Sequence, residues 1–173
     1  MNESTALPYQ LISSEENPLY RHFGSLCVPY ENYVLNFMRV HGGEAYTGGV
    51  YEFRLYPNGA LVMALPETEM KITYQSDGGM CDISISLECL SYVAAAFFWS
   101  AVCSQAFERE DDRTNQFAHD HFHATRDAVS GLFRFVLLDD IGTREPTEEE
   151  LLQAVNFIGH AHPESQQFYA CID

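Results

Sequence analysis

One apolar run in the middle of the chain, CLSYVAAAFFWSAVC at residues 89–103, limits the folds that are open to this sequence. The run is shorter than the roughly 18 to 20 apolar residues that a membrane-spanning helix needs, so we interpret it as a helix buried in a protein core. Ser86 is well placed to cap the start of this helix, and the charged sequence after Phe107 ends it.

The sequence before this helix alternates between apolar and polar residues, which is the period of half-buried strands. In the first of these segments Tyr51, Phe53 and Leu55 share one face, and Arg54 lies on the opposite, polar face. Asn58-Gly59 can take positive φ at both residues and turn the chain back as a hairpin. Four alternating segments follow one another, which predicts an antiparallel four-stranded meander: 50–56, 60–65, 70–75 and 80–86.

Helical patterns fill most of the remaining sequence, apart from residues 1–18, which are polar and interrupted by proline and which we expect to form a loose N-terminal arm. Strands followed by consecutive helices favour an α+β fold, with helices covering one face of the sheet. The length suits a single domain, residues 1–173. The predicted additional helices run from Pro29 to Gly42, from about Asp112 to Leu138, from Thr147 to about Gly159, and for a turn or two after Pro163.

The net charge of -16 combines 25 acidic residues with only 9 basic ones, and Lys71 is the only lysine. Such a surface is repelled by phosphate backbones and anionic lipids, so we expect no direct contact with nucleic acid or membrane. A basic partner protein is favoured instead. The five cysteines include no C-x-x-C pair, and the first residues lack the pattern of a signal peptide, which indicates free thiols and a cytoplasmic location.

The sequence HDHFHATRD contains the most suggestive candidate for chemistry, because His119 and His123 lie one helical turn apart. A metal-dependent hydrolase built on this pair would need a third ligand, for which His160 or His162 are candidates. Short histidine pairs often match by chance, and a solvated helix face explains them equally well. Because motifs for phosphate binding, dinucleotide binding and nucleophilic catalysis are absent from the sequence, we expect neither an enzyme nor a cofactor.

Two acidic segments, residues 108–112 and 139–150, raise the alternative of a protein that mimics DNA. Their charges are separated by arginines and do not obviously reproduce the density of one charge per roughly 1.7 Å of DNA axis. Part of the second segment also has an ordinary use, since carboxylates in the first turn of a helix complement its macrodipole. As candidate partner-binding residues we select its carboxylates: Asp139, Asp140, Glu148, Glu149 and Glu150.

The hairpin and several other segments resemble the ArdB/KlcA antirestriction family, small proteins of plasmids and bacterial genomic islands. HFG at residues 22–24, Glu31 before an aromatic-rich helix, and the helix start at Ser86 fit the family pattern, as do FHATRD at 122–127 and the closing FYACID. Ala60 stands where the family has a second turn glycine. The hairpin residues that match the family pattern are Gly48, Gly49, Tyr51, Glu52, Phe53, Asn58, Gly59, Met63 and Ala64.

This resemblance implies a single-domain α+β protein that relieves type I restriction of incoming unmodified DNA and so helps mobile DNA to establish itself. It implies macromolecular contact rather than catalysis, with a type I restriction-modification complex or a host DNA-processing protein as the partner. It implies no catalytic residues. We expect a monomer or a weak homodimer in the bacterial cytoplasm. The sequence departs from the family in residues 131–160, which are longer than the usual link and carry the acidic cluster.

Overall fold

The computed structural model describes residues 7–75, 82–131 and 160–173, and its central element is the helix α3, Leu87–Glu108. The side chain of Ser86 caps α3 by accepting a hydrogen bond from the N–H of Cys89 at 3.1 Å. By length and mean hydropathy α3 could cross a membrane, but 72% of its most apolar window is buried inside the protein. The predicted core helix and its cap are therefore confirmed.

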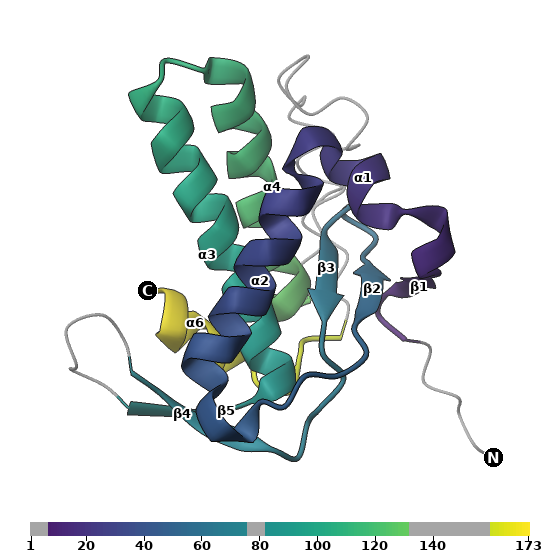
Figure 1. Cartoon of the computed structure of the whole chain (residues 1–173), viewed down its shortest axis with the longest axis vertical. Helices are drawn as coiled ribbons and strands as arrows, with labels where there is room; N and C mark the ends of the chain where they lie inside the picture. Colours follow the sequence, from purple (N-terminus) through teal and green to yellow (C-terminus); the bar gives the residue numbers. More distant parts are fainter. Residues whose placement is uncertain (1–6, 76–81, 132–159) are drawn as a thin grey trace.

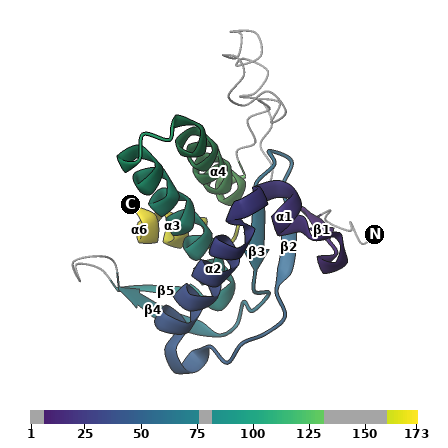
Figure 2. The ribbon, with the colours of Figure 1, turned by 45° about the horizontal axis from the view of Figure 1, so that its top comes forward.

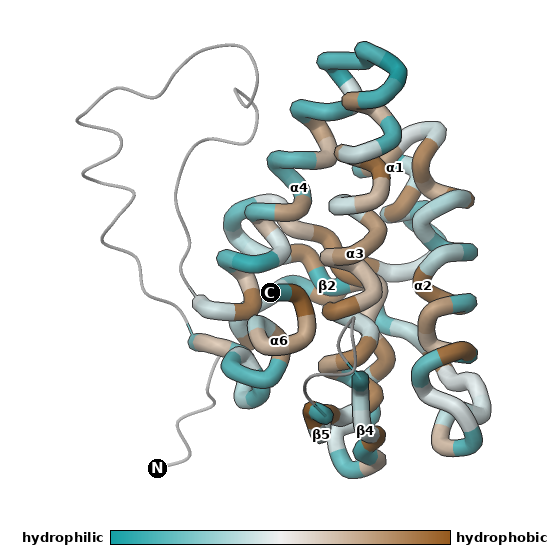
Figure 3. Tube along the Cα trace, turned by 90° about the vertical axis from the view of Figure 1, so that its left-hand side faces the viewer, coloured by the Kyte–Doolittle hydropathy of each residue, from teal (hydrophilic) through white to brown (hydrophobic). Residues whose placement is uncertain are grey.

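Helices surround α3 on several sides (Figures 1 and 2). Apolar positions are concentrated along α3, and hydrophilic positions gather where α3 connects to α4 (Figure 3). The α4 helix ends before the predicted Leu138, because Gly131 adopts a φ of 73° and its N–H bonds to the carbonyl oxygen of Ala128. The helices have these bounds: α1 Pro18–Phe23, α2 Cys27–Gly42, α4 Asp112–Ser130 and α6 Ser165–Ile172, with short 3-10 turns at Ser14–Glu16, Gly24–Leu26 and Gly43–Ala45.

The strands form two antiparallel sheets, so the prediction of one four-stranded meander is wrong. After β3 the backbone N–H of Leu65 donates to the hydroxyl of Ser91, and Pro66 has no N–H to donate. The side chain of Glu67 then accepts from the N–H groups of Glu69 and Met70, which turns the chain away from β3 before the next strand begins. The first sheet has the order β1 (Gln10–Ile12), β2 (Glu52–Leu55), β3 (Leu61–Ala64), and the second pairs β4 (Lys71–Gln75) with β5 (Asp82–Ser86).

The edge of the first sheet is occupied by β1, which lies within the segment that we expected to be a loose arm. Gln10–Ile12 pairs antiparallel with β2, and Leu11 lies opposite Arg54. Residues 1–6 of that segment lie outside the described residues. The structure therefore places at least part of the N-terminal segment next to the central strand of the sheet.

The hairpin between β2 and β3 uses a three-residue turn in which Gly59, with a φ of 81°, has positive φ and Asn58 does not. The N–H of Gly59 bonds to the carbonyl of Tyr56 at 2.9 Å, and the N–H of Tyr56 bonds to the carbonyl of Ala60 at 2.9 Å. Asn58 is only 7% exposed. Its Nδ2 donates to the carbonyl of Ala124 in α4 at 2.8 Å, and its Oδ1 accepts from the N–H of Ala60 at 3.1 Å. The asparagine of the turn therefore joins the hairpin to a helix.

Replacing Asn58 by alanine removes two buried hydrogen bonds and leaves the N–H of Ala60 without its acceptor. We expect Asn58→Ala to lower the free energy of unfolding by about 1 to 3 kcal/mol, measured by urea denaturation. Asn36→Ala, at an exposed position of α2, is the matched control and should change it by less than about 0.5 kcal/mol. Equal effects of the two substitutions would show that the contact with α4 contributes nothing.

Candidate functional site

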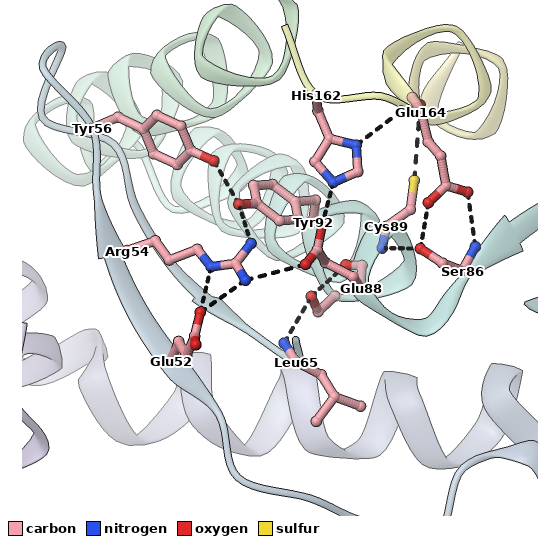
Figure 4. A network of polar contacts seen from close by, with 11 residues as sticks. Glu52, Arg54, Tyr56, Leu65, Ser86, Glu88, Cys89, Tyr92, His162 and Glu164 are labelled. Carbon is pink, nitrogen blue, oxygen red and sulfur yellow. Dashed lines mark hydrogen bonds and ion pairs between the residues drawn. The ribbon is translucent and has the colours of Figure 1, made fainter. Parts of the chain in front are cut away.

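Arg54 of β2 is only 4% exposed, so the face of the strand opposite Phe53 and Leu55, which we expected to be the solvated one, is buried at this position. The guanidinium of Arg54 points toward α3, where Glu88 and Tyr92 accept hydrogen bonds from it (Figure 4). Nε donates to Oε2 of Glu52 at 2.9 Å, Nη2 donates to Oε2 of Glu88 at 3.1 Å, and Nη1 donates to the hydroxyl of Tyr92 at 3.1 Å. A buried guanidinium is tolerated because these groups replace its hydration.

The C-terminal segment joins this network through His162. Its Nε2 lies 2.6 Å from Oε1 of Glu88, and its Nδ1 accepts a hydrogen bond from the backbone N–H of Glu164 at 3.0 Å. The backbone N–H of His162 donates to the carbonyl oxygen of Val129 at 2.8 Å. Since Nδ1 accepts a hydrogen bond, the ring proton lies on Nε2 and is donated to Glu88. The imidazole is therefore held in one tautomer, with both nitrogens engaged.

Glu164 closes the network at the start of α3. One carboxylate oxygen accepts the backbone N–H of Ser86 at 2.9 Å, and the other accepts the Ser86 hydroxyl. A carboxylate at a helix N-terminus is stabilised by the unpaired N–H groups and by the macrodipole. The side chain of Ser86 thus connects Glu164 to the N–H of Cys89, and the last part of the chain is tied to the first turn of the core helix.

The surroundings shift the pKa values of several groups in the network. Burial raises the pKa of Glu88, but the hydrogen bond from His162 and the charge of Arg54 outweigh burial and hold that pKa below its ordinary value. Burial lowers the pKa of Arg54, and the neighbouring Tyr92 and Glu88 reverse this into a net increase. Burial also raises the pKa of Tyr92 to about 12. At neutral pH the site consequently combines a carboxylate, a guanidinium and a phenol in their ordinary charge states.

A cleft of about 380 Å³ lies beside this network. Its lining includes Arg54 and Glu88, tyrosine rings from the N-terminal segment and from β2, and the histidines of the C-terminal segment. The ring of Tyr9 stands 4.6 Å from the guanidinium carbon of Arg54 and meets Tyr56 edge to face at 5.5 Å. Both ring nitrogens of His162 are hydrogen-bonded at this wall of the cleft, one to Glu88 and one to the N–H of Glu164.

The sequence-predicted histidine pair lies elsewhere, on α4. The rings of His119 and His123 are 4.3 Å apart, and Nδ1 of His119 is 3.5 Å from a carboxylate oxygen of Asp120. Within residues 7–75, 82–131 and 160–173, no group of three or more His, Cys, Asp and Glu side chains is placed to hold a metal ion. His162, which we considered as a third ligand, contacts Glu88 instead.

The candidate partner-binding carboxylates all lie within residues 132–159, outside the described residues, as does the helix that we predicted from Thr147 to about Gly159. Their role in partner binding stays a prediction. The carboxylates concerned are Asp139, Asp140, Glu148, Glu149 and Glu150.

The sequence offered two signals for the network that we did not use. The first is Arg54, a charged residue among the aromatic and aliphatic residues of a strand. If such a strand packs against a helix, its buried charge needs a hydrogen-bonding partner. Glu88 and Tyr92 are four residues apart at the start of the most apolar helix, so they share one face of it. Together they form a polar strip in the buried first half of that helix.

Searches for relatives found a structural likeness and no match in sequence. No family model and no curated protein matches this chain. A solved structure does match, described as "The structure of the KlcA and ArdB proteins show a novel fold and antirestriction activity against Type I DNA restriction systems in vivo but not in vitro". The likeness has a TM-score of 0.64 at 20% sequence identity and covers 100% of both chains. The chain therefore has an ArdB/KlcA-like fold, as the resemblance in sequence predicted.

Removing the charge of Arg54 should leave the buried carboxylate of Glu88 without a counter-ion. We expect Arg54→Met to lower the free energy of unfolding by about 3 to 5 kcal/mol. In the double variant with Glu88→Gln the loss should be smaller than the sum of the single losses, with a coupling of about 0.5 to 3 kcal/mol. Urea denaturation measures both, and Arg39→Met at an exposed position of α2 is the control. Additive losses would show that the two side chains do not act as a pair.

His121, between the two histidines of the pair, belongs to the core and has a shifted pKa. Its ring stacks on Trp99 at 4.7 Å, and burial, followed by the nearby charge of His22, lowers its pKa from 6.5 to about 4. Between these pH values the unfolded chain binds a proton that the folded chain excludes. The contribution of His121 to the free energy of unfolding is therefore complete above pH 6.5 and is lost as the pH falls toward 4.

His121→Phe keeps an aromatic ring on Trp99 and removes the proton site. Between pH 7 and pH 4 the free energy of unfolding of this variant should fall by about 3 kcal/mol less than that of the unchanged protein. Urea denaturation across this range measures the difference. His119→Gln, at an exposed position, is the control for the loss of a histidine that is not packed on Trp99. An unaltered pH dependence in His121→Phe would contradict the burial of a neutral imidazole.

Proposed function

We propose that this chain is an antirestriction protein, which relieves type I restriction of incoming unmodified DNA by macromolecular contact rather than by catalysis. The observation that carries the proposal is the likeness to the KlcA and ArdB structure, which extends over the whole of both chains. The hairpin signature of that family adds to it, because Asn58 of the signature fixes the hairpin to α4. On this proposal the signature residues stabilise the fold, and the function depends on the surface that the fold presents.

The charge of the protein supports action by contact. A net charge of -16 accelerates encounters with a basic partner and opposes direct binding to DNA. The network beside the cleft also supports it, because both ring nitrogens of His162 are hydrogen-bonded, so this imidazole has no free nitrogen to serve as a base. We propose as partner a type I restriction-modification complex or a host DNA-processing protein in the bacterial cytoplasm.

The proposal is tested by transferring unmodified DNA into cells with a type I restriction system, with and without expression of this protein. We expect the efficiency of transfer to rise toward that of modified DNA, because contact with the partner prevents cleavage. Modified DNA and a strain without the restriction system are the controls. Equal restriction with and without the protein, at confirmed expression, would refute the function.

The acidic cluster can be tested in the same assay. Replacing Asp139, Asp140, Glu148, Glu149 and Glu150 by the corresponding amides should weaken restriction relief, because complementary charge steers the partner to the surface. Neutralising an equal number of carboxylates elsewhere, with Glu31, Glu44, Glu69, Glu108 and Asp112 as the set, controls for net charge. Full relief by the first variant would remove the cluster from the partner site.

Two alternatives predict different outcomes with purified protein. A DNA mimic would bind an isolated restriction enzyme and be displaced by added DNA. A metal-dependent hydrolase built on His119 and His123 would contain stoichiometric metal by elemental analysis. Neither displacement by DNA nor stoichiometric metal is expected for a protein that acts by contact with its partner and does not mimic DNA.

A further inference from the structure

The charges beneath the cleft do not cancel. The single guanidinium of Arg54 contacts two carboxylates, those of Glu52 and Glu88. His162 adds no positive charge, because its Nδ1 accepts the N–H of Glu164 and its proton on Nε2 faces Glu88. In the part of the chain that the structure describes, no other cationic side chain is bonded to either carboxylate. Arg54, Glu52 and Glu88 together therefore carry one more negative than positive charge.

Glu88 can accept further hydrogen bonds. Among the described residues its Oε1 faces His162 and its Oε2 faces Arg54, one partner for each oxygen, whereas an ionised carboxylate has about four acceptor sites. The residue is only 8% exposed, and in such surroundings a bond to an opposite charge is stronger than in water. Glu88 lines the cleft, so its acceptor sites are available to a group that enters.

The walls of the cleft are aromatic. Two tyrosines line it: Tyr9, directly before β1, and Tyr56, directly after β2. The face of an aromatic ring attracts cations through its quadrupole, and Arg54 already uses one ring, that of Tyr9, in this way. A carboxylate that shares its counter-ion Arg54 with Glu52, in a cleft lined by tyrosines, favours a cation and disfavours phosphate or carboxylate groups.

From this geometry we propose that the cleft binds the side chain of an arginine on a basic polypeptide. A volume of about 380 Å³ is at the lower end of ligand cavities, which fits one long side chain. The guanidinium is preferred over an ammonium because it is planar, stacks on tyrosine and bonds a carboxylate through two N–H groups. The net charge of -16 raises the local concentration of such a partner.

The test uses the 173-residue chain, labelled for NMR, and N-acetyl-arginine amide as the probe. Saturable shifts should appear in the ring signals of His162 and in the signals of Tyr9. N-acetyl-citrulline amide, which has the same shape without the charge, should bind about tenfold more weakly or worse. Equal binding of the citrulline compound, an absence of saturable shifts, or tighter binding of inorganic phosphate at these signals would overturn the proposal.

A pair of variants locates the site. Tyr9→Leu keeps the apolar wall and removes the ring, so the affinity for the arginine compound should fall by about two- to fivefold. Tyr20→Leu, at a tyrosine of α1 that is 68% exposed and not part of the cleft lining, should leave it unchanged. Equal effects of the two substitutions would place binding elsewhere. Binding of the arginine compound is measured directly, so a failure to bind does not affect the antirestriction proposal. Likewise, a lack of restriction relief in cells does not affect the binding result.

Discussion

The pairing of Arg54 with Glu88 is the interaction on which the arrangement of the chain depends. A guanidinium inside a protein requires acceptors, and here they come from the strand β2 and from the core helix α3. Glu88 in turn holds His162, and the adjacent Glu164 caps α3 through Ser86. Three segments that are distant in the sequence are therefore fastened around one buried group of charges, and the cleft lies where they meet.

The helices were largely predictable from the sequence, because each has a local signal. Ser86 caps α3, and Gly42 ends α2. The end of α4 was missed because the left-handed conformation of Gly131 competes with a helical pattern that continues beyond it. Strand positions followed from alternation, but their pairing did not: the turn built by Glu67 and the addition of β1 to the sheet both depend on contacts that periodicity does not encode.

The candidate site was harder to predict than the fold. Alternation placed Arg54 opposite the apolar residues of its strand, and that reasoning fails where both faces of a strand are covered, since the polar face then needs buried partners. Those partners come from residues 34 and 38 positions further along the chain. His162 stood out only as a possible metal ligand, because a histidine near other histidines suggests metal more readily than a bond to a distant glutamate. The likeness to the KlcA and ArdB structure, at 20% sequence identity, bears on the fold and not on this site.

The central claim is that a neutral imidazole, and not a second cation, faces the buried carboxylate of Glu88. The ring ¹⁵N chemical shifts of His162 at neutral pH report this directly, because a protonated and an unprotonated ring nitrogen resonate far apart. The account predicts a proton on Nε2 and none on Nδ1. A ring protonated on both nitrogens would cancel the excess negative charge, remove the acceptor of the Glu164 N–H, and contradict the account of the network and its cleft.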